Sequence, residues 1–205
     1  MGFLSDSDRL RIDEAIREVE ARTSGEIVTV IARESDDYYY IPSLWAALCA
    51  LFLPALVIAG GLQGTLLDSY GAQVLVFMVA MVLFRIPALK YRLIPKGVKR
   101  RRASRLAREQ FLLQNLHHTE GRTGVLLFVA VAEHYVEVIA DKGVNAVVPN
   151  GTWDWVVADF VAQVKAGKIA DGFVRAIEGI GSHLIQHFPV ADGDRNELPN
   201  HLVEL

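Results

Sequence analysis

Four ionisable side chains have the types and positions that acid–base or metal chemistry needs. Glu26 directly precedes a short β-branched run, Arg122 lies just before a second apolar run, and Asp141 and Lys142 directly follow a third. Two carboxylates that meet at neighbouring strand ends can act as an acid–base pair or hold a divalent cation such as Ca²⁺ or Mg²⁺. The alternative is that Glu26 and Asp141 are ordinary strand-end charges paired with Arg122 and Lys142.

No catalytic residue can be assigned from motifs. The sequence has no Cys-x₅-Arg nucleophile loop, no Asp-x-Asp phosphoryl acceptor and no Walker-type loop. His183 and His187 have the i,i+4 spacing of two metal ligands, but the sequence offers no evident third ligand. The single cysteine, Cys49, lies in an apolar run, so no disulfide can form within the chain.

Local patterns predict the elements that would position these residues. Ser5 and Asp8 form a capping-box-like start to a helix that ends near Gly25, followed by a buried strand over Glu26–Ala32. A long helix is expected over 96–118. Further strands are expected over Gly124–Ala132 and Tyr135–Ala140, the last two forming an antiparallel hairpin. Two closing helices follow, the first capped by Gly167 and the second ended by Pro189, and the polar tail 190–205 is expected to be irregular.

This order of elements predicts the fold class. Two strands joined through a helix should be parallel, with a right-handed connection. The prediction is therefore an α/β fold, a three-layer sandwich around a small mixed sheet. In that arrangement Glu26, Arg122, Asp141 and Lys142 gather at one rim of the sheet, which we call the strand-end rim.

Two apolar stretches predict a transmembrane hairpin inserted after the first strand. Residues 38–67 carry no charge, and their apolar core, 44–62, would be roughly 28 Å long as a helix, close to the thickness of a bilayer core. A second span is expected over 72–89, and residues 63–71 are expected to form the turn between them. A chain this short could not bury two such helices in a soluble core.

A basic segment follows the second span and sets the expected orientation. Residues 90–108 carry nine Lys and Arg residues and no acid. Such an excess marks the cytoplasmic side, so both termini and the domain should be cytoplasmic. We expect this basic segment to contact anionic lipid headgroups. Nucleic acid is disfavoured because the rest of the domain is acidic, and a docking surface for an acidic partner stays open. The expected headgroup contacts are Lys90, Arg92, Lys96, Lys99, Arg100, Arg101, Arg102 and Arg105.

The expected organisation is thus a single soluble domain in two parts. Its boundaries are 1–37 for the first part of the domain, 38–89 for the hairpin, 90–108 for the basic segment and start of the crossover helix, 109–189 for the second part, and 190–205 for the tail.

These segments together resemble the TPM domain family. The resemblance rests on Thr23-Ser24-Gly25-Glu26-Ile27-Val28, on Thr123-Gly124-Val125-Leu126-Leu127-Phe128-Val129, and on residues 135–143 with the closing helices. It is closest to bacterial membrane-bound members whose domain is split by transmembrane helices. The resemblance implies a Rossmann-like sandwich and a place in the bacterial inner membrane. It also implies acid phosphatase activity, divalent-metal binding, or assistance in assembling and repairing membrane complexes. Many members have acidic residues where this chain has Arg122 and Thr123, which would remove ligand charge from a metal site.

Two functions remain open on these grounds. The first is a membrane-anchored domain that binds membrane-protein partners in assembly, repair or quality control. The second is a membrane-bound, metal-assisted phosphohydrolase that uses Glu26 and Asp141.

Overall fold

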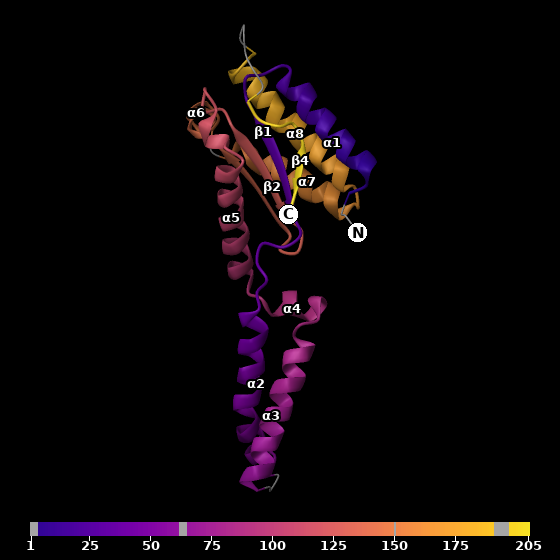
Figure 1. Ribbon diagram of the computed structural model, residues 1–205, viewed down its shortest axis with the longest axis vertical. Coiled ribbons are helices and arrows are strands. Elements are labelled where there is room, and N and C mark those ends of the chain that lie inside the picture. The colour runs from indigo at the N-terminus through magenta and orange to yellow at the C-terminus, as the bar shows by residue number, and fades with distance from the viewer. Residues whose placement is uncertain (1–3, 62–64, 150, 191–196) are drawn as a thin grey trace. The chain divides into compact units, whose positions relative to one another are not determined.

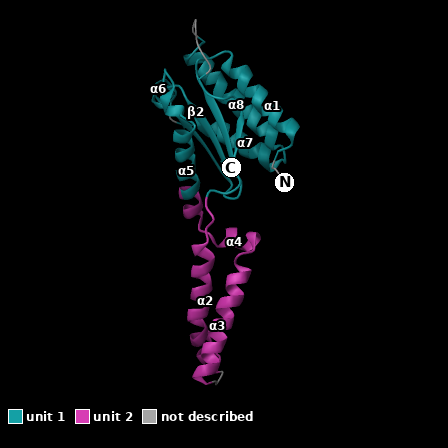
Figure 2. Ribbon diagram, viewed as in Figure 1, with its two compact units in different colours: residues 1–35, 102–205 teal, residues 36–101 magenta. Residues whose placement is uncertain are grey.

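The computed structural model describes residues 4–61, 65–149, 151–190 and 197–205. The chain divides into two compact units (Figure 2): residues 1–35 with 102–205 form the first, and residues 36–101 form the second. The first unit is a mixed α/β domain and the second is helical. Each unit is described by itself below.

The first helix, α1 (Asp6–Glu20), begins as its sequence predicts. The Ser5 side chain accepts from the backbone N–H of Asp8, and the Asp8 side chain accepts from the backbone of Ser5, a complete capping box. One face of α1 is buried, because apolar residues recur at helical spacing. The buried residues are Ile12, Ala15, Ile16 and Val19.

Four of the described segments form one mixed sheet in the strand order β3-β2-β1-β4, in which β4 is Leu202–Glu204. β1 (Ile27–Ala32) and β2 (Val125–Ala130) are parallel, with Ile27 opposite Val125. β3 (Tyr135–Ala140) runs antiparallel to β2, with Ala140 opposite Val125. The prediction of a small mixed sheet with a parallel central pair and an antiparallel hairpin is confirmed.

Helices cover both faces of the sheet (Figure 1), as a three-layer sandwich requires. α1, α7 (Thr152–Lys165) and α8 (Ile169–His187) pack on one face, where Phe160, Phe173 and Ile177 are buried. The other face carries α5 (Lys96–Leu113), whose residues from 102 onward belong to this unit. Between β3 and α7 lies the short α6 (Lys142–Val147). Residues from alternate positions of β1 and β2 enter the two cores.

The second unit is a helical hairpin with a short third helix. α2 (Tyr40–Ala59) and α3 (Leu66–Leu83) pack along each other, and the Gln73 side chain donates to the carbonyl of Ala50 at 3.2 Å. Both are long and apolar enough to cross a membrane, judged by length and composition. α4 (Pro87–Leu93) follows, and its Leu93 carbonyl accepts from the Trp45 indole at 3.2 Å.

Several boundaries differ from those expected. α2 covers Tyr40–Ala59, against an expected first span of 44–62. α3 begins at Leu66 instead of 72, because Thr65 and Asp68 form a capping box there, and α4 is a separate helix. Residues 62–64, which include the end of the expected first span and the start of the expected turn, lie outside the described residues. The expected helix over 96–118 ends at Leu113 because Asn115 is left-handed, and Leu116–His118 form a 3₁₀ turn, η1.

The prediction of an irregular tail is wrong for its last residues. Leu202–Glu204 form β4, parallel to β1, with Leu202 opposite Thr29. The pattern of the tail did not indicate a strand, because β4 is only three residues long and depends on contacts with α1 and β1, far away in the sequence. The stretch 191–196 of the same tail is not among the described residues.

Candidate functional site

The strand-end rim is built on a tight approach of β1 to the end of α8. The backbone N–H of Ser24 donates to the Phe188 carbonyl at 3.0 Å, and Gly25 donates to the Thr23 hydroxyl at 3.1 Å. A Cβ on Gly25 would lie 3.0 Å from a methyl of Leu184. The segment before β1 therefore follows the end of α8 closely, and it places Glu26 directly before the first residue of β1.

Glu26 is a buried carboxylate that contacts the C-terminal segment. Only 5% of the residue is exposed. Its Oε1 accepts a hydrogen bond from the backbone N–H of Glu197 at 2.9 Å. The Glu197 carboxylate in turn accepts from the backbone N–H of Glu120 at 3.1 Å. Glu26 therefore joins the start of β1 to the last residues of the chain.

A second carboxylate, Glu20, lies beside Glu26 and was not foreseen. Its Oε1 accepts from the backbone N–H of Ile27 at 3.0 Å. Burial, together with the Glu26 carboxylate, raises the pKa of Glu20 to about 8, against the lowering effect of hydrogen bonds from Ile27 and Asn200. Glu20 closes an ordinary amphipathic helix six residues before Glu26, and no motif in the sequence distinguishes it from the helix's other acids.

Asp141 has a structural task at the end of β3. Its Oδ1 accepts from the backbone N–H of Lys142 at 2.8 Å, so it is the N-cap of α6. The residue is 7% exposed, and its Oδ2 is buried without a hydrogen-bond partner among the described residues.

Arg122 and Gly143 hold the α6 turn against the start of β2. The backbone N–H of Gly143 donates to the Arg122 carbonyl at 3.0 Å, and a Cβ on Gly143 would lie 2.6 Å from that oxygen. The side chains of Arg122 and Lys142 are exposed. Within the described ranges, neither forms an ion pair with Glu26 or Asp141, so the expected pairing of strand-end charges is absent there.

The two rim carboxylates lie on opposite sides of β2. Ile27, Val125 and Ala140 are in register, so Glu26 and Asp141 flank Gly124 two strand spacings apart, roughly 9.6 Å in the backbone. A Cβ on Gly124 would lie 2.5 Å from the carbonyl oxygen of Leu116. The 3₁₀ turn thus covers the strand between the two acids. Glu26 is associated with Glu20 and the C-terminal segment, and Asp141 with α6.

The described residues do not bring together a metal-binding set. Among them, no group of three or more His, Cys, Asp or Glu side chains is placed to hold a metal ion. A calcium ion takes six to eight oxygen ligands, and the Glu20–Glu26 pair supplies fewer. His183 of the i,i+4 pair packs edge-on against Trp153 at 5.7 Å between ring centroids.

The basic segment spans both units. Lys90, Arg92, Lys96, Lys99, Arg100 and Arg101 belong to the second unit, and Arg102, Arg105 and Arg108 to the first. Two of the cations lie over aromatic rings: Lys90 is 5.1 Å and Lys99 is 5.8 Å from the ring centroid of Tyr91. Tyr91 also packs on a small buried cluster of Tyr38, Ile41 and Ile94. Arg105 pairs with Glu109 at 2.8 Å.

The fold and the rim define a class of protein: a small three-layer α/β domain interrupted after its first strand by an apolar helical hairpin. The model of the TPM domain family matches residues 64–183, more than half of the chain, and the chain belongs to that family. The match runs from two residues before α3 to near the end of α8, so α1 and β1 lie outside it.

A solved structure has the same fold. The NMR structure of the BA42 protein from the psychrophilic bacterium Bizionia argentinensis aligns with a TM-score of 0.63 and 23% identity, covering 100% of this chain and 97% of that one. At this identity the likeness establishes the fold alone. No curated protein matches the chain.

Proposed function

We propose that the chain is a membrane-anchored TPM-domain protein whose α/β domain binds membrane-protein partners during assembly, repair or quality control. The observation that carries the anchoring is the apolar outer surface of the second unit. Along α2 and α3, large apolar side chains face outward, with Ile58 77% and Leu66 82% exposed.

Burial distinguishes a membrane hairpin from the core helices of a soluble protein. Of the most apolar window of each helix, 17% is buried in α2 and 6% in α3. A soluble core helix would be mostly buried, and monomeric soluble proteins rarely expose apolar patches larger than a few hundred Å². A hydrocarbon environment accounts for this exposure, because lipid tails are as apolar as the side chains that the two helices turn outward.

The basic segment supports an orientation with the domain on the cytoplasmic side of a bacterial inner membrane. Lys and Arg in excess next to a span favour that side. Arg92, Lys96, Arg100 and Arg101 are exposed and suited to anionic phosphate headgroups, at about 1 kcal/mol for each charge near the surface. Lys90 and Lys99 lie over Tyr91, so their charges are fixed close to the start of α5.

Partner binding is favoured over catalysis because the buried carboxylates of the rim already accept hydrogen bonds from backbone N–H groups. Glu26 accepts from Glu197, Glu20 from Ile27, and Asp141 from Lys142. Each of these bonds holds an element of the domain in place. The backbone positions of Glu26 and Asp141 are also separated by β2, at roughly 9.6 Å.

A second candidate, a phosphohydrolase, is favoured by one observation. The pKa of Glu20 is raised to about 8, by burial first and by the Glu26 carboxylate, and a carboxyl group with a strongly raised pKa is typical of acid–base sites. A general acid at Glu20 would have to donate its proton to a leaving group that reaches the start of β1.

The experiment that tests the proposal is affinity capture of the full tagged chain from mildly solubilised native membranes, with untagged membranes as the control. Recovery of a stoichiometric membrane protein supports partner binding, and its consistent absence contradicts it. The same preparation is assayed for phosphate release from a broad substrate panel with Mg²⁺, Mn²⁺ or Ca²⁺. Release that Glu20→Gln and Glu26→Gln abolish would favour the phosphohydrolase instead.

A further inference from the structure

A groove of about 470 Å³ lies between α1 and α8, and we call it the α1–α8 groove. Its volume is within the range of ligand-binding clefts, and none of the rim carboxylates lines it. The two helices lie side by side (Figure 1) and run parallel. Arg11 near the start of α1 pairs with Asp171 near the start of α8, and Ser24 after α1 bonds to Phe188 after α8. The groove therefore follows the length of a parallel helix pair.

The floor of the α1–α8 groove is apolar. Gly181 allows α8 to approach α1 closely, because a Cβ at this position would overlap the side chain of Val19. Val19 and Ala15 are buried, and Ile185 lies half-buried on the facing helix. The floor therefore offers an aliphatic surface on which an alkyl chain can pack.

Charged side chains form the mouth of the groove. Glu18 of α1, Glu178 of α8 and Arg22, two residues after the end of α1, all line it and are exposed. Two carboxylates against one guanidinium make the mouth acidic. The last turn of α1 adds to this, since the C-terminal end of a helix carries a partial negative charge. The complementary ligand is therefore a cation.

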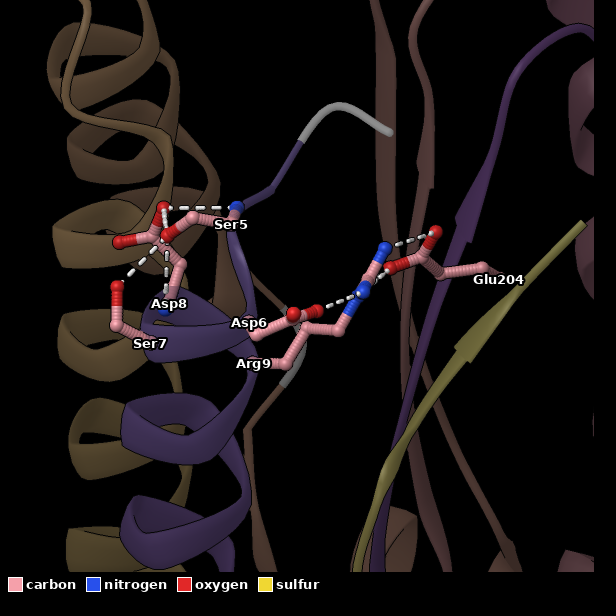
Figure 3. Close-up of polar contacts among 6 residues, drawn as sticks. All are labelled: Ser5, Asp6, Ser7, Asp8, Arg9 and Glu204. Carbon is pink, nitrogen blue, oxygen red and sulfur yellow. Dashed lines mark hydrogen bonds and ion pairs between the residues drawn. The ribbon is translucent and has the colours of Figure 1, made fainter. Parts of the chain in front are cut away.

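The domain does not use these three charges to hold itself together. Near the start of α1, by contrast, Arg9 donates to Asp6 and to Glu204, each at 2.6 Å (Figure 3). Across the ranges that the structure describes, the three side chains of the groove mouth form no ion pair and no hydrogen bond. Glu178 acts on Arg175 electrostatically from a distance. The mouth is thus accessible to a ligand.

We propose that the α1–α8 groove binds a Lys or Arg side chain from a cytoplasmic loop of the membrane-protein partner, with Glu18 and Glu178 receiving its cationic head and the floor its alkyl stem. This rests on the proposed partner-binding function and identifies the chemistry of the partner's segment. Cytoplasmic loops of inner-membrane proteins carry an excess of Lys and Arg, and such side chains pack their stems on apolar surface while the charge stays near water. A small molecule fits less well, because such ligands are usually buried by roughly 70–90% and this mouth is exposed.

The test uses the full chain in nanodiscs of phosphatidylcholine, which has no net charge to attract the probe. The probe is a fluorescein-labelled octapeptide of two arginines and two leucines among glycines and serines. Glu18→Gln with Glu178→Gln should bind it at least about fivefold more weakly than the wild type does. Glu14→Gln with Asp154→Asn removes two exposed charges outside the groove and should bind like the wild type. Equal affinity of the three chains, or none for the wild type, would overturn the proposal.

Charge reversal and steric blocking test where the probe binds. Glu18→Arg with Glu178→Arg should bind a peptide with glutamates in place of the arginines at least about tenfold more tightly than the wild type does. Ser182→Trp fills the groove without changing its charge and should weaken binding of the arginine peptide. Ala162→Trp, at an exposed position of α7, should not. Reversal that changes the affinity for neither peptide would overturn the ion pairing, and unchanged binding by Ser182→Trp would place the peptide elsewhere.

Other occupants give different results in the same preparation. Free arginine that displaces the peptide at equal concentration would make a small cation the ligand. A crosslinked dimer that the peptide competes away would make the basic segment of a second copy the occupant. Either result overturns the proposal.

Affinity capture separates the groove from the proposed function. A native partner retained equally by the wild type and by Glu18→Gln with Glu178→Gln contradicts the groove alone. Peptide binding that depends on both glutamates, without any captured native partner, contradicts the proposed function.

Discussion

The carboxylate of Glu20 accepts the backbone N–H of Ile27 at 3.0 Å and so caps the one end of the β1 edge that β4 does not reach. An acid that caps a strand edge while buried beside Glu26 is costly when ionised. Its proton therefore connects the stability of the domain to pH.

Stability should fall as pH rises between about 4.5 and 8. The pKa of Glu20 is raised from 4.5 to about 8 in the folded chain, so the folded state binds the proton more tightly than the unfolded state in this window. The contribution is fully present below pH 4.5 and is lost as pH rises through 8, with an upper limit of about 5 kcal/mol. Glu20→Gln should flatten this dependence and make the chain more stable than the wild type at pH 8.5.

Thermal unfolding followed by tryptophan fluorescence from pH 5 to 9 checks this. Glu18→Gln, on the exposed face of the same helix, is the matched control and should leave the slope unchanged. If Glu20→Gln and Glu18→Gln give the same slope, the buried carboxyl does not bind the proton as described.

Two glycines of the rim should not tolerate a methyl group. In Gly124→Ala the new Cβ would meet the Leu116 carbonyl at 2.5 Å, and in Gly143→Ala it would meet the Gly121 and Arg122 carbonyls at 2.5 and 2.6 Å. Each should destabilise the domain by about 1–3 kcal/mol, the usual cost of overpacking. Gly97→Ala, a helical position with nothing within 4 Å, should be neutral or stabilising. Limited proteolysis at increasing temperature ranks the three, and equal resistance would refute the packing described.

The single cysteine allows a direct measurement of topology. In a Cys49→Ser background, Lys165→Cys in the domain and Leu66→Cys at the start of α3 are both exposed positions. A membrane-impermeant maleimide should label Lys165→Cys in inverted vesicles and Leu66→Cys in right-side-out vesicles, each at several times the level of the opposite preparation. Labelling of both from one side would show that the hairpin does not cross the bilayer.

Anionic lipid should be enriched around the second unit. Replacing Arg92, Lys96, Arg100 and Arg101 by Gln removes four exposed charges, each contributing about 1 kcal/mol at an anionic surface. The selectivity for spin-labelled phosphatidylglycerol over phosphatidylcholine should fall severalfold. Lys165→Gln with Lys168→Gln, outside the basic segment, is the control, and the same loss of selectivity there would exclude a specific role for the segment.

The elements that a local pattern defines were predictable, and those that depend on distant contacts were not. β1, β2 and β3 are continuous apolar runs, and their parallel and antiparallel pairing follows from what connects them. β4 is three residues held by Arg9 and Asp13, about 190 positions earlier in the chain, and nothing local indicates it.

The strand-end rim divides in the same way: the positions of its residues were predictable, and their contacts were not. Strand ends placed Glu26 and Asp141 at one edge, but the coverage of Gly124 by Leu116 follows from how η1 packs on β2. The association of Glu20 with Glu26 depends on how α1 lies beside β1. Sequence reasoning thus indicated the edge and could not identify which of its side chains interact.

The position of the hairpin also orders events during synthesis. β1 is a central strand, yet both of its neighbours are translated after residues 36–101: β2 about 100 residues later and β4 at the very end. At about 5–20 residues per second, β1 waits roughly 5–20 s for β2. The four-stranded sheet can therefore be completed only after α2 and α3 have been translated.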